Sequence, residues 1–379
     1  MSGDARATIL SRDLPLDGFS IGVTADRRAE EQCEMLRRRG ARVLHGPAIR
    51  TVPLAPDAHM KAATELLIAS PPDFLVANTG IGIRGWFAAV ESWGLGDELL
   101  AALADTRILA RGPKAAGAIL TAGLSVAWRS PTERLTEAVT EVLATAPAGS
   151  SVAVQLDGNV EQQEIERLRT AGHRVTDVRV YEWHEPLDAE PALRLLQAVC
   201  EQRVDAVTFT SAAALQSFVA LADREGRADE LRTAINGSVL AVCVGPVCAR
   251  AANDVGLRGL YPERPRLGAM VHWLTAELNA RQLRLGLAGT TVVVQGAALT
   301  IDGERVLLTD RERSVLERLL EKRGAVVGRS ELLRSVWGAA GESHALDVTI
   351  ARLRRKLGPA GPALRTVVRR GYRLELDPA

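Results

Sequence analysis

A short stretch near the end of the chain has an unusual density of positive charge. The segment ALDVTIARLRRKLG, residues 345–358, carries four cations: Arg352, Arg354, Arg355 and Lys356. The whole chain of 379 residues has a formal net charge of only +1. From residue 281 onward there are 18 lysines and arginines against 11 aspartates and glutamates, whereas residues 1–280 hold 29 against 35. A basic end behind an acidic body indicates two functions, and the basic one favours a polyanion as partner.

The spacing of apolar residues in this stretch predicts an amphipathic helix. Apolar side chains recur at i, i+4, i+7 and i+11 and form one stripe: Leu346, Ile350, Leu353 and Leu357. A second face and its flanks carry Thr349, Arg352, Arg354, Arg355 and Lys356. The helix therefore has one face for a core and one face for a charged partner or for solvent.

Neighbouring segments predict a small domain around this helix. Thr309 and Glu312 match a capping box, in which a threonine caps a helix and a glutamate three residues later reaches back. A second short helix is predicted in ELLRSVWG, and LRTVVRRGYRLEL predicts a hairpin around Arg370-Gly371. Three helices followed by a hairpin are typical of a winged helix-turn-helix, whose third helix enters the major groove of DNA. The alternative interpretation of the basic face is a solvated surface.

The region 291–379 resembles the DNA-binding domain of OmpR/PhoB-type response regulators, on the motifs LDVTIARLRRKLG and LRTVVRRGYRLEL. The resemblance implies double-stranded promoter DNA as partner, with Thr349 and Arg352 facing base edges. The remaining DNA-binding candidates are placed nearer phosphates or on the wing: Arg354, Arg355, Lys356, Arg370 and Arg373. Ala351 departs from the family, which often has a basic residue there, and no phospho-accepting receiver pattern is found upstream.

The body of the chain contains an internal repeat. The segments that begin at Pro72 and Val204 each run from an aspartate and an apolar strand through a small-residue turn into an amphipathic helix. Each continues to a second strand that ends in Gly-Pro and to a second helix. Shorter segments beginning at Phe19 and Ser151 share a strand–helix–strand pattern. Two copies of a βαβαβα unit predict an α/β fold with two parallel sheets covered by helices on both faces.

The stretch GIGIRG, residues 80–85, is rich in glycine and raises the question of a phosphate-binding loop. A dinucleotide fingerprint needs its third glycine inside a helix that follows a clear strand. We favour the plainer interpretation, a turn that enters a helix. No Walker loop, HExxH motif or placeable carboxylate pair accompanies the stretch. The sequence therefore predicts no cofactor and no metal site.

Residues 18–280 resemble uroporphyrinogen-III synthase (HemD), which cyclises hydroxymethylbilane while inverting one pyrrole ring. The likeness lies in the repeat layout and in the segments DAVTFTSAAALQSF, AVCVGPVCARAANDVG and VRVYEW. It implies two interleaved, doubly wound parallel-sheet domains joined by extended connectors around a cleft. One domain is formed by 18–51 with 183–280 and the other by 52–178. Tyr181 stands where the family has a tyrosine often proposed to assist catalysis.

The synthase resemblance also implies an anionic ligand, because the family's linear tetrapyrrole carries many carboxylates. Loops at strand carboxyl ends and helix amino ends supply backbone N–H donors and partial positive charge. The candidate loop residues are Asn78, Thr79, Gly80, Arg111, Gly112, Lys114, Thr210, Ser211, Ala212, Gly245 and Pro246. Plainer roles stay open for several of these residues. Thr210 and Ser211 would then only cap a helix, Arg111 and Lys114 would belong to a solvated loop, and Tyr181 would be a packed strand residue.

Departures from the synthase pattern leave two functions open. The family's Gly-Pro-Thr-Thr-Ala reads Gly245-Pro246-Val247-Cys248-Ala249, which removes both hydroxyls, and Ala115 stands where the family tends to keep a threonine. The first hypothesis is a transcriptional regulator whose body senses a small anionic ligand, a tetrapyrrole or a partner regulator. The second is a working synthase, a cyclising hydro-lyase, with an added DNA-binding domain.

The combined architecture resembles regulators of nitrate and nitrite assimilation in actinobacteria, and the arginine-heavy composition agrees with such a source. That resemblance implies control of nitrogen assimilation or of siroheme-linked genes, because siroheme is made from uroporphyrinogen III. We also expect a dimer on tandem DNA sites, since a lone winged helix binds weakly.

The remaining segments complete the predicted layout. Residues 1–17 predict a loose arm without a secretory signal, and residues 281–290 predict a linker before the winged helix. The four cysteines match no zinc spacing and are expected to be reduced thiols. No apolar run reaches the length of a membrane span, so we expect a cytoplasmic protein.

Overall fold

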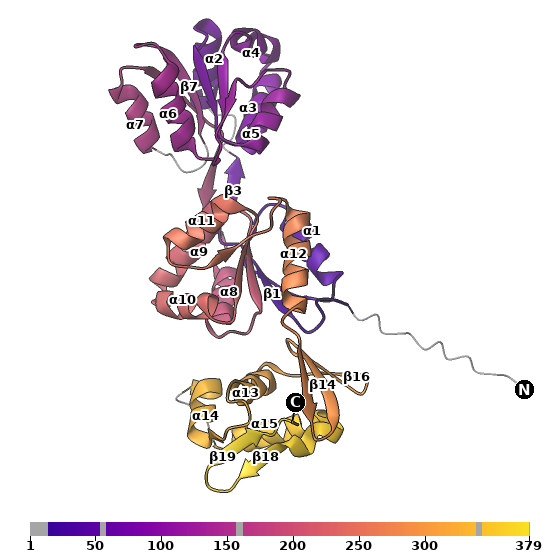
Figure 1. Ribbon diagram of the computed structural model, residues 1–379. Helices are drawn as coiled ribbons and strands as arrows, with labels where there is room; N and C mark the ends of the chain where they lie inside the picture. Colours follow the sequence, from indigo (N-terminus) through magenta and orange to yellow (C-terminus); the bar gives the residue numbers. More distant parts are fainter. Residues whose placement is uncertain (1–13, 54–57, 157–161, 339–342, 379) are drawn as a thin grey trace, which may run out of the picture. The chain divides into compact units, whose positions relative to one another are not determined.

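The computed structural model describes residues 14–53, 58–156, 162–338 and 343–378 (Figure 1). It divides into two units, one formed by the residues up to 47 with those from 190 onward, and one formed by residues 48–189. Within the first unit, lobe 1 is the parallel sheet with its helices, and the C-terminal domain is the region from Leu283 onward. The second unit is lobe 2.

Lobe 1 is built on a five-stranded parallel sheet in the order β12-β11-β10-β1-β2. Its strands are β1 (Ser20–Val23), β2 (Arg42–His45), β10 (Ala206–Phe209), β11 (Leu240–Cys243) and β12 (Gly259–Leu260). Strands β1, β10 and β11 are buried along their whole length, as expected for a parallel sheet covered on both faces. The helices are α1 (Ala29–Arg37), α8 (Glu190–Cys200), α9 (Ala212–Arg224), α10 (Ala228–Asn236), α11 (Pro246–Asp254) and α12 (Leu267–Asn279).

Lobe 2 repeats this arrangement with the order β6-β5-β4-β7-β8, again all parallel. Its strands are β4 (Phe74–Ala77), β5 (Arg107–Ala110), β6 (Trp128–Arg129), β7 (Ser151–Leu156) and β8 (Arg174–Arg179). One face of the sheet packs on α2 (Ala58–Ala69), α3 (Gly80–Ser92), α4 (Gly96–Leu103) and α5 (Pro113–Thr121). The other face packs on α6 (Leu135–Thr145) and α7 (Gln162–Thr170).

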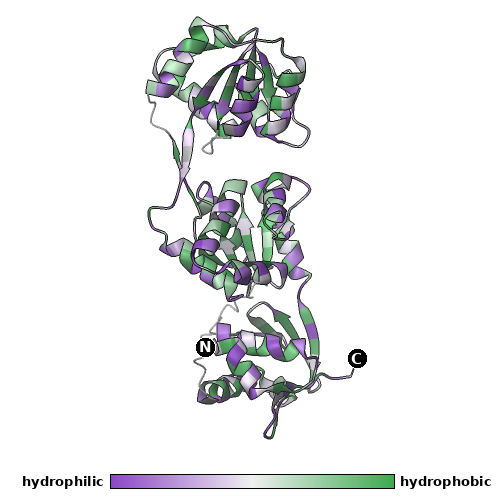
Figure 2. Cartoon of the chain, turned by 90° about the vertical axis from the view of Figure 1, so that its left-hand side faces the viewer, coloured by the Kyte–Doolittle hydropathy of each residue, from purple (hydrophilic) through white to green (hydrophobic). Residues whose placement is uncertain are grey.

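The two lobes confirm the predicted repeat and the α/β fold class. Strand β4 occupies the central position in lobe 2 that β10 occupies in lobe 1, and β7 corresponds in the same way to β1. The predicted extended connectors form an antiparallel pair, β3 (Arg50–Pro53) with β9 (Tyr181–His184). Figure 2 shows hydrophobic colouring concentrated on the central strands, which agrees with their apolar runs.

The C-terminal domain has the predicted winged helix-turn-helix architecture. An antiparallel sheet comes first, with strands β13 (Leu283–Leu287), β14 (Thr290–Gln295), β15 (Ala298–Ile301) and β16 (Glu304–Leu307). Three helices follow, α13 (Asp310–Glu321), α14 (Arg329–Trp337) and α15 (Ser343–Lys356). A 3-10 segment, Gly358–Ala363, leads to a three-stranded sheet of β17 (Val327–Gly328), β18 (Leu364–Val367) and β19 (Gly371–Leu374).

Local signals account for the helices of this domain. Both halves of the capping box are present, because Thr309 Oγ1 accepts from the Glu312 N–H and Glu312 accepts from the Thr309 N–H. The predicted apolar stripe of α15 is fully buried in the domain core: Leu346, Ile350, Leu353 and Leu357. The stripe therefore fixes which side of α15 remains available outside the core.

Two predicted boundaries need correction. The segment 281–290, expected to be a linker, contains β13, so the C-terminal domain begins at Leu283. The arm predicted for 1–17 is wrong at its end, because Leu16 is fully buried in the core of lobe 1. Residues 1–13 of that arm lie outside the described residues.

Candidate functional site

Two arginines of α15 face away from the core of the C-terminal domain. Arg352 and Arg355 are exposed on the side opposite the buried stripe. Among the residues that the structure describes, neither guanidinium has a hydrogen-bond or ion-pair partner. Two unpaired cations one turn apart on a helix surface can bind phosphates or the edges of guanine.

Thr349 and Lys356, also predicted to bind DNA, are engaged inside the domain. Thr349 is 8% exposed, and its hydroxyl donates to the Ala345 carbonyl at 2.8 Å. Lys356 Nζ donates to Glu312 Oε2 at 2.6 Å and to the Leu307 carbonyl at 2.8 Å. Burial alone would raise the pKa of Glu312, but hydrogen bonds from Lys356 and from the Thr309 N–H lower it below its ordinary value. The Lys356 bonds tie the end of α15 to α13 and to the end of β16, whereas the Thr349 bond stays within α15. The DNA contacts of both residues stay predictions.

Arg354 joins α15 to the base of the wing. Its Nε donates to the Leu364 carbonyl at 2.8 Å, and its second amino group donates to Thr366 Oγ1 at 2.7 Å. Its phosphate contact stays a prediction. A guanidinium with two partners on β18 is nevertheless well placed to fix the angle between the helix and the wing.

The tip of the wing, between β18 and β19, carries the other exposed cations. Arg369 and Arg370 are exposed beside Val368, and Arg369 has a φ of 60° in the tight turn. Arg373, predicted as a wing contact, is half-buried and donates to Glu375 Oε1 at 2.9 Å. Arg369 is the residue that sequence reasoning missed, although its place beside Arg370 in the turn was the available signal.

A compact cluster links the start of α15 to the wing. Arg329 donates two hydrogen bonds to the Asp347 carboxylate, at 2.7 and 2.9 Å, and a third to the Tyr372 hydroxyl at 2.6 Å. Tyr372 in turn donates to Asp347 at 2.5 Å. Hydrogen bonds from Arg329 and Tyr372 lower the pKa of Asp347 from 3.8 to about 2. No local pattern in the sequence indicates this cluster, because its three members lie on three separate elements.

The predicted loops of lobe 2 meet at the carboxyl ends of β4 and β5. Arg111 donates from its amino group to Asn78 Oδ1 at 2.7 Å and from Nε to the Glu133 carbonyl at 3.0 Å. Asn78 is only 4% exposed, and its Nδ2 has no partner among the described residues. A buried amide donor left without an acceptor is costly, so this donor is available to a ligand or to an ordered water.

Helix amino ends lie beside that donor. Thr79 caps α3, since its hydroxyl accepts from the Gly82 N–H at 3.1 Å. Gly112 precedes α5 as its capping residue, and Lys114 is exposed in the first turn of α5. A Cβ on Gly80 would lie 2.2 Å from the Lys114 carbonyl oxygen, so the glycine lets α3 and α5 approach closely. The two helix ends contribute partial positive charge at one edge of the lobe 2 sheet.

Packing also explains the second glycine of GIGIRG. A Cβ on Gly82 would lie 2.1 Å from Gln155 Nε2. Gln155 is fully buried on β7, and its Oε1 accepts from the Thr79 N–H at 2.9 Å. The stretch is therefore a helix entry shaped around a glutamine, which is the plainer of the two interpretations. Gln155 was missed in the sequence because it stands inside an otherwise apolar strand.

Tyr181 lies against the same loop. It is 5% exposed within the apolar core of lobe 2, and its ring packs against Trp183 with centroids 5.9 Å apart. Its hydroxyl donates to Thr79 Oγ1 at 3.3 Å. Tyr181 is thus a packed strand residue whose hydroxyl also contacts the candidate ligand-binding loop at Thr79.

In lobe 1, the equivalent loops follow β10 and β11. Ser211 caps α9 by accepting from the Ala214 N–H at 3.1 Å, and Thr210 and Ala212 beside it are half-buried. Gly245 and Pro246 begin α11 in the same way that Gly112 and Pro113 begin α5. The neighbouring register of β10 and β11 brings these two loops together.

The described residues contain neither a cluster of three or more histidine, cysteine or acidic side chains able to hold a metal ion nor a helix long and apolar enough to cross a membrane. The four cysteines are free thiols. A hydrogen bond with Cys243, together with burial, raises the pKa of the Cys248 thiol.

Comparison with known proteins identifies both parts of the chain. A family model described as uroporphyrinogen-III synthase HemD matches residues 30–272, and one described as transcriptional regulatory protein, C terminal, matches residues 303–374. The crystal structure of a mutant uroporphyrinogen III synthase from the extremely thermophilic bacterium Thermus thermophilus has 28% identity and a TM-score of 0.59. The similarity covers 69% of this chain and 100% of that structure.

Two curated relatives match different parts of the chain. The uncharacterized protein YjjA of Bacillus subtilis (strain 168) is 28% identical over 256 residues, which are 67% of this chain and 94% of YjjA. The transcriptional regulatory protein KdpE of Mycobacterium tuberculosis (strain ATCC 25618 / H37Rv) is 43% identical over 115 residues. These are 29% of this chain, and they span about half of KdpE, 51% of its length. Because the synthase family model covers more than half of the sequence, the chain belongs to the uroporphyrinogen-III synthase (HemD) family, with an added C-terminal domain that matches the model of transcriptional regulatory proteins.

Proposed function

We propose that this protein is a sequence-specific transcriptional regulator in which a synthase-family body controls a DNA-binding domain. The observation that carries the proposal is the pair of exposed guanidiniums of Arg352 and Arg355, unpartnered among the described residues, on the third helix of a winged helix-turn-helix. Arg369 and Arg370 on the wing supply further cations for the DNA backbone or minor groove.

The test of DNA binding uses the full chain and its own upstream DNA. Fluorescence anisotropy would measure the affinity for fragments of that region and for a random duplex, each at several salt concentrations. We expect one fragment to bind far more tightly than the random duplex, with an affinity that falls steeply with salt. Equal affinity for all fragments at every salt concentration would contradict sequence-specific binding.

We further propose that the body binds a small anionic ligand, with a carboxylate-rich tetrapyrrole as the first candidate. Support comes from lobe 2, where Asn78 Nδ2, without a partner among the described residues, lies beside the Arg111 guanidinium and the amino ends of α3 and α5. A thermal-shift screen against tetrapyrroles, nitrate and nitrite tests this, because a ligand selective for the folded state raises the melting temperature. Asn78→Ala should remove the shift given by the true ligand, and a partner regulator becomes the better hypothesis if no compound stabilises the protein.

The genes under control are proposed to serve nitrogen assimilation or siroheme synthesis. This rests on the resemblance of the architecture to regulators of nitrate and nitrite assimilation. Mapping the bound promoters across the genome of the source organism tests it. Sites confined to unrelated genes would overturn this part while leaving DNA binding intact.

The second candidate function is a working uroporphyrinogen-III synthase that also binds DNA. Family membership and the Tyr181 hydroxyl at the Thr79 loop favour it. Against it stand Val247 and Cys248, which replace the family's two threonines in the loop after β11. Incubation of the purified protein with hydroxymethylbilane decides, since type-III product at enzymatic rates supports the synthase and only spontaneous type-I product supports the regulator.

A further inference from the structure

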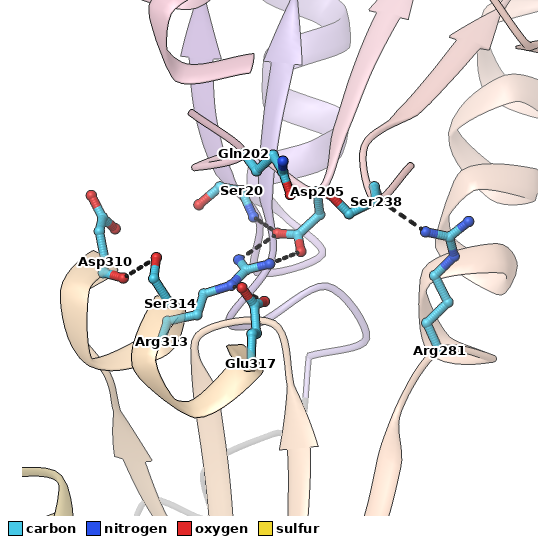
Figure 3. Close-up of polar contacts among 9 residues, drawn as sticks. All are labelled: Ser20, Gln202, Asp205, Ser238, Arg281, Asp310, Arg313, Ser314 and Glu317. Carbon is cyan, nitrogen blue, oxygen red and sulfur yellow. Dashed lines mark hydrogen bonds and ion pairs between the residues drawn. The ribbon is translucent and has the colours of Figure 1, made fainter. Parts of the chain in front are cut away.

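The C-terminal domain is docked on lobe 1 through an ion pair that is almost fully buried. Arg313 of α13 donates to both carboxylate oxygens of Asp205, at 2.6 and 3.1 Å, as Figure 3 shows. The exposed fractions of the two side chains are 13% and 9%. A bidentate pair removed from water holds its geometry firmly, and removing one partner of a buried pair is costly. Arg313 Nε also donates to Glu317 Oε1 at 2.8 Å, so Glu317 stays beside the guanidinium when the Asp205 charge is removed.

Further contacts join the C-terminal domain to lobe 1 at residues 17 and 18. The Ala297 N–H donates to the Gly18 carbonyl at 2.8 Å, and Gln295 Nε2 donates to the Asp17 carbonyl at 2.9 Å. A Cβ on Gly18 would lie 2.4 Å from the Gln295 carbonyl oxygen, and both Gly18 and Gly296 have positive φ angles, 85° and 56°. The hairpin between β14 and β15 is therefore fitted against the first turn of lobe 1, at a distance that only glycine permits.

Asp205 belongs to the framework of the lobe 1 sheet. Its Oδ2 accepts from the Ser20 N–H at 2.7 Å, and its own carbonyl accepts from the Leu240 N–H at 3.0 Å. It thus ties together the starts of β1, β10 and β11. Strand β10 follows directly, with all four residues fully buried, and it ends at the Thr210–Ser211 loop. One short rigid strand separates the docking pair from a candidate ligand loop.

On the other side, α13 is joined to the DNA-contacting helix. Glu312 precedes Arg313 in the first turn of α13, and its carboxylate holds Lys356 at the end of α15. Two neighbouring residues of α13 therefore carry one charged link to lobe 1 and one to α15. A contiguous path runs from the Ser211 loop through β10, Asp205, α13 and Lys356.

We propose that α13 couples lobe 1 to the DNA-contacting helix, with the Asp205–Arg313 pair as the link on which the coupling depends. The proposal rests on the proposed function, because it takes DNA as the ligand of α15. Coupling between two sites is reciprocal, so DNA bound at α15 must alter the lobe 1 end of the path. That consequence can be measured without knowing what binds at the Ser211 loop.

The first experiment measures backbone amide exchange in the full chain without DNA. Asp205→Asn keeps an acceptor for the Ser20 N–H and removes the charge, whereas Arg313→Gln removes the charge from the other side. Each variant should exchange about tenfold faster than the native chain in the peptides covering 205–214 and 310–321. Asp229→Asn is the matched control, since Asp229 pairs with Arg232 on the exposed surface of the same lobe. Unchanged exchange in both peptides, with lobe 2 also unchanged, would overturn the proposal.

The second experiment adds short random-sequence duplex at low ionic strength, with binding followed in parallel by anisotropy. In the native chain, saturating duplex should slow exchange in 205–214 at least about fivefold, the lower end of usual coupling between sites. The Asp205→Asn variant should bind the duplex but lose that effect, and the Asp229→Asn variant should keep it. Binding without any change at 205–214, or a change that survives Asp205→Asn, would contradict the coupling. Absence of binding would instead count against the proposed function, and the DNA-free measurement would still decide the coupling.

Discussion

Lys356 and Glu312 form an ion pair inside the C-terminal domain, with Nζ 2.6 Å from Oε2 and the carboxylate side chain only 3% exposed. The last cation of the basic helix therefore has a partner within the domain, and we expect its role to be structural. Its neighbours Arg352 and Arg355 are exposed, so we expect this run of positive charge to serve two roles.

Lys356→Ala should lower the stability of the protein and leave its contacts with DNA phosphates unchanged. The change leaves Glu312 buried and unpaired, which we expect to lower the free energy of unfolding by about 1–3 kcal/mol. Urea denaturation would measure the loss, and the salt dependence of DNA affinity should keep its native slope. A normal stability with a shallower slope would mean that Lys356 contacts phosphate after all.

Arg352→Ala should lower the affinity for the specific DNA site by about 1–3 kcal/mol, the usual contribution of a good contact between arginine and a base. The affinity for a random duplex should change much less. Anisotropy on both duplexes gives the comparison. An equal loss on both would assign Arg352 to the backbone rather than to a base.

Arg355→Ala should weaken binding to all sequences alike. Loss of one phosphate contact is expected to reduce the slope of log affinity against log salt by about 0.9. Arg232→Ala serves as the control, because it removes a cation from an exposed ion pair of lobe 1. A slope that stays native in Arg355→Ala would exclude the phosphate contact.

The lowered pKa of Asp347 predicts that the stability of the protein depends on pH in the acid range. Its pKa is lowered to about 2 in the folded chain by Arg329 and Tyr372. A lowered folded pKa stabilises the protein above the ordinary value of 3.8, and the contribution disappears as pH falls through about 2. Asp347→Asn should therefore be less stable than the native chain near neutral pH. Because the carboxylate is 47% exposed, we expect a difference of no more than about 1 kcal/mol.

Melting curves from neutral pH down to acid would test this dependence. The gap in melting temperature between Asp347→Asn and the native chain should stay constant down to about pH 4 and then close toward pH 2. A gap that persists unchanged at the acid end would show that the loss comes from packing and not from charge.

Two glycine-to-alanine changes should have opposite effects on the stability of the protein. Gly117 is exposed in the middle of α5, and no atom of a neighbouring element lies within 4 Å of where an added methyl group would stand. Gly117→Ala should therefore stabilise the protein by about 0.5–1 kcal/mol. Gly82→Ala would push on Gln155 and should destabilise by about 1–3 kcal/mol. Thermal melts of the two variants provide the comparison, and a neutral Gly82→Ala would mean that Gln155 moves aside freely.

Local patterns in the sequence were sufficient for the α/β class of the body and for the winged helix. The repeat predicted equivalent positions for β4 and β10, and the buried leucine stripe predicted the orientation of α15. Such features depend on periodicity and on capping within a few residues, and both are visible in one chain.

The contacts that position the site were not predictable in the same way. Asp205 and Arg313 are 108 residues apart, and nothing local to either residue indicates the other. Lys356 lies on the flank of its helix, where only the position of α13 decides whether it faces solvent or Glu312. Arg373 likewise has the right type and motif for DNA, but the neighbouring Glu375 engages it.

The connection between α12 and β13 is only residues 280–282, a span of about 10 Å when fully stretched. Lobe 1 and the C-terminal domain are therefore not independent modules that recombination or engineering can exchange freely. A chimera that receives a foreign winged helix at this joint inherits a partner for Asp205 and for Gly18 only if the newcomer brings a matching arginine and a matching glycine. The contact surface between lobe 1 and the C-terminal domain therefore decides whether such a chimera folds correctly. A longer connection between the two domains would not restore that contact.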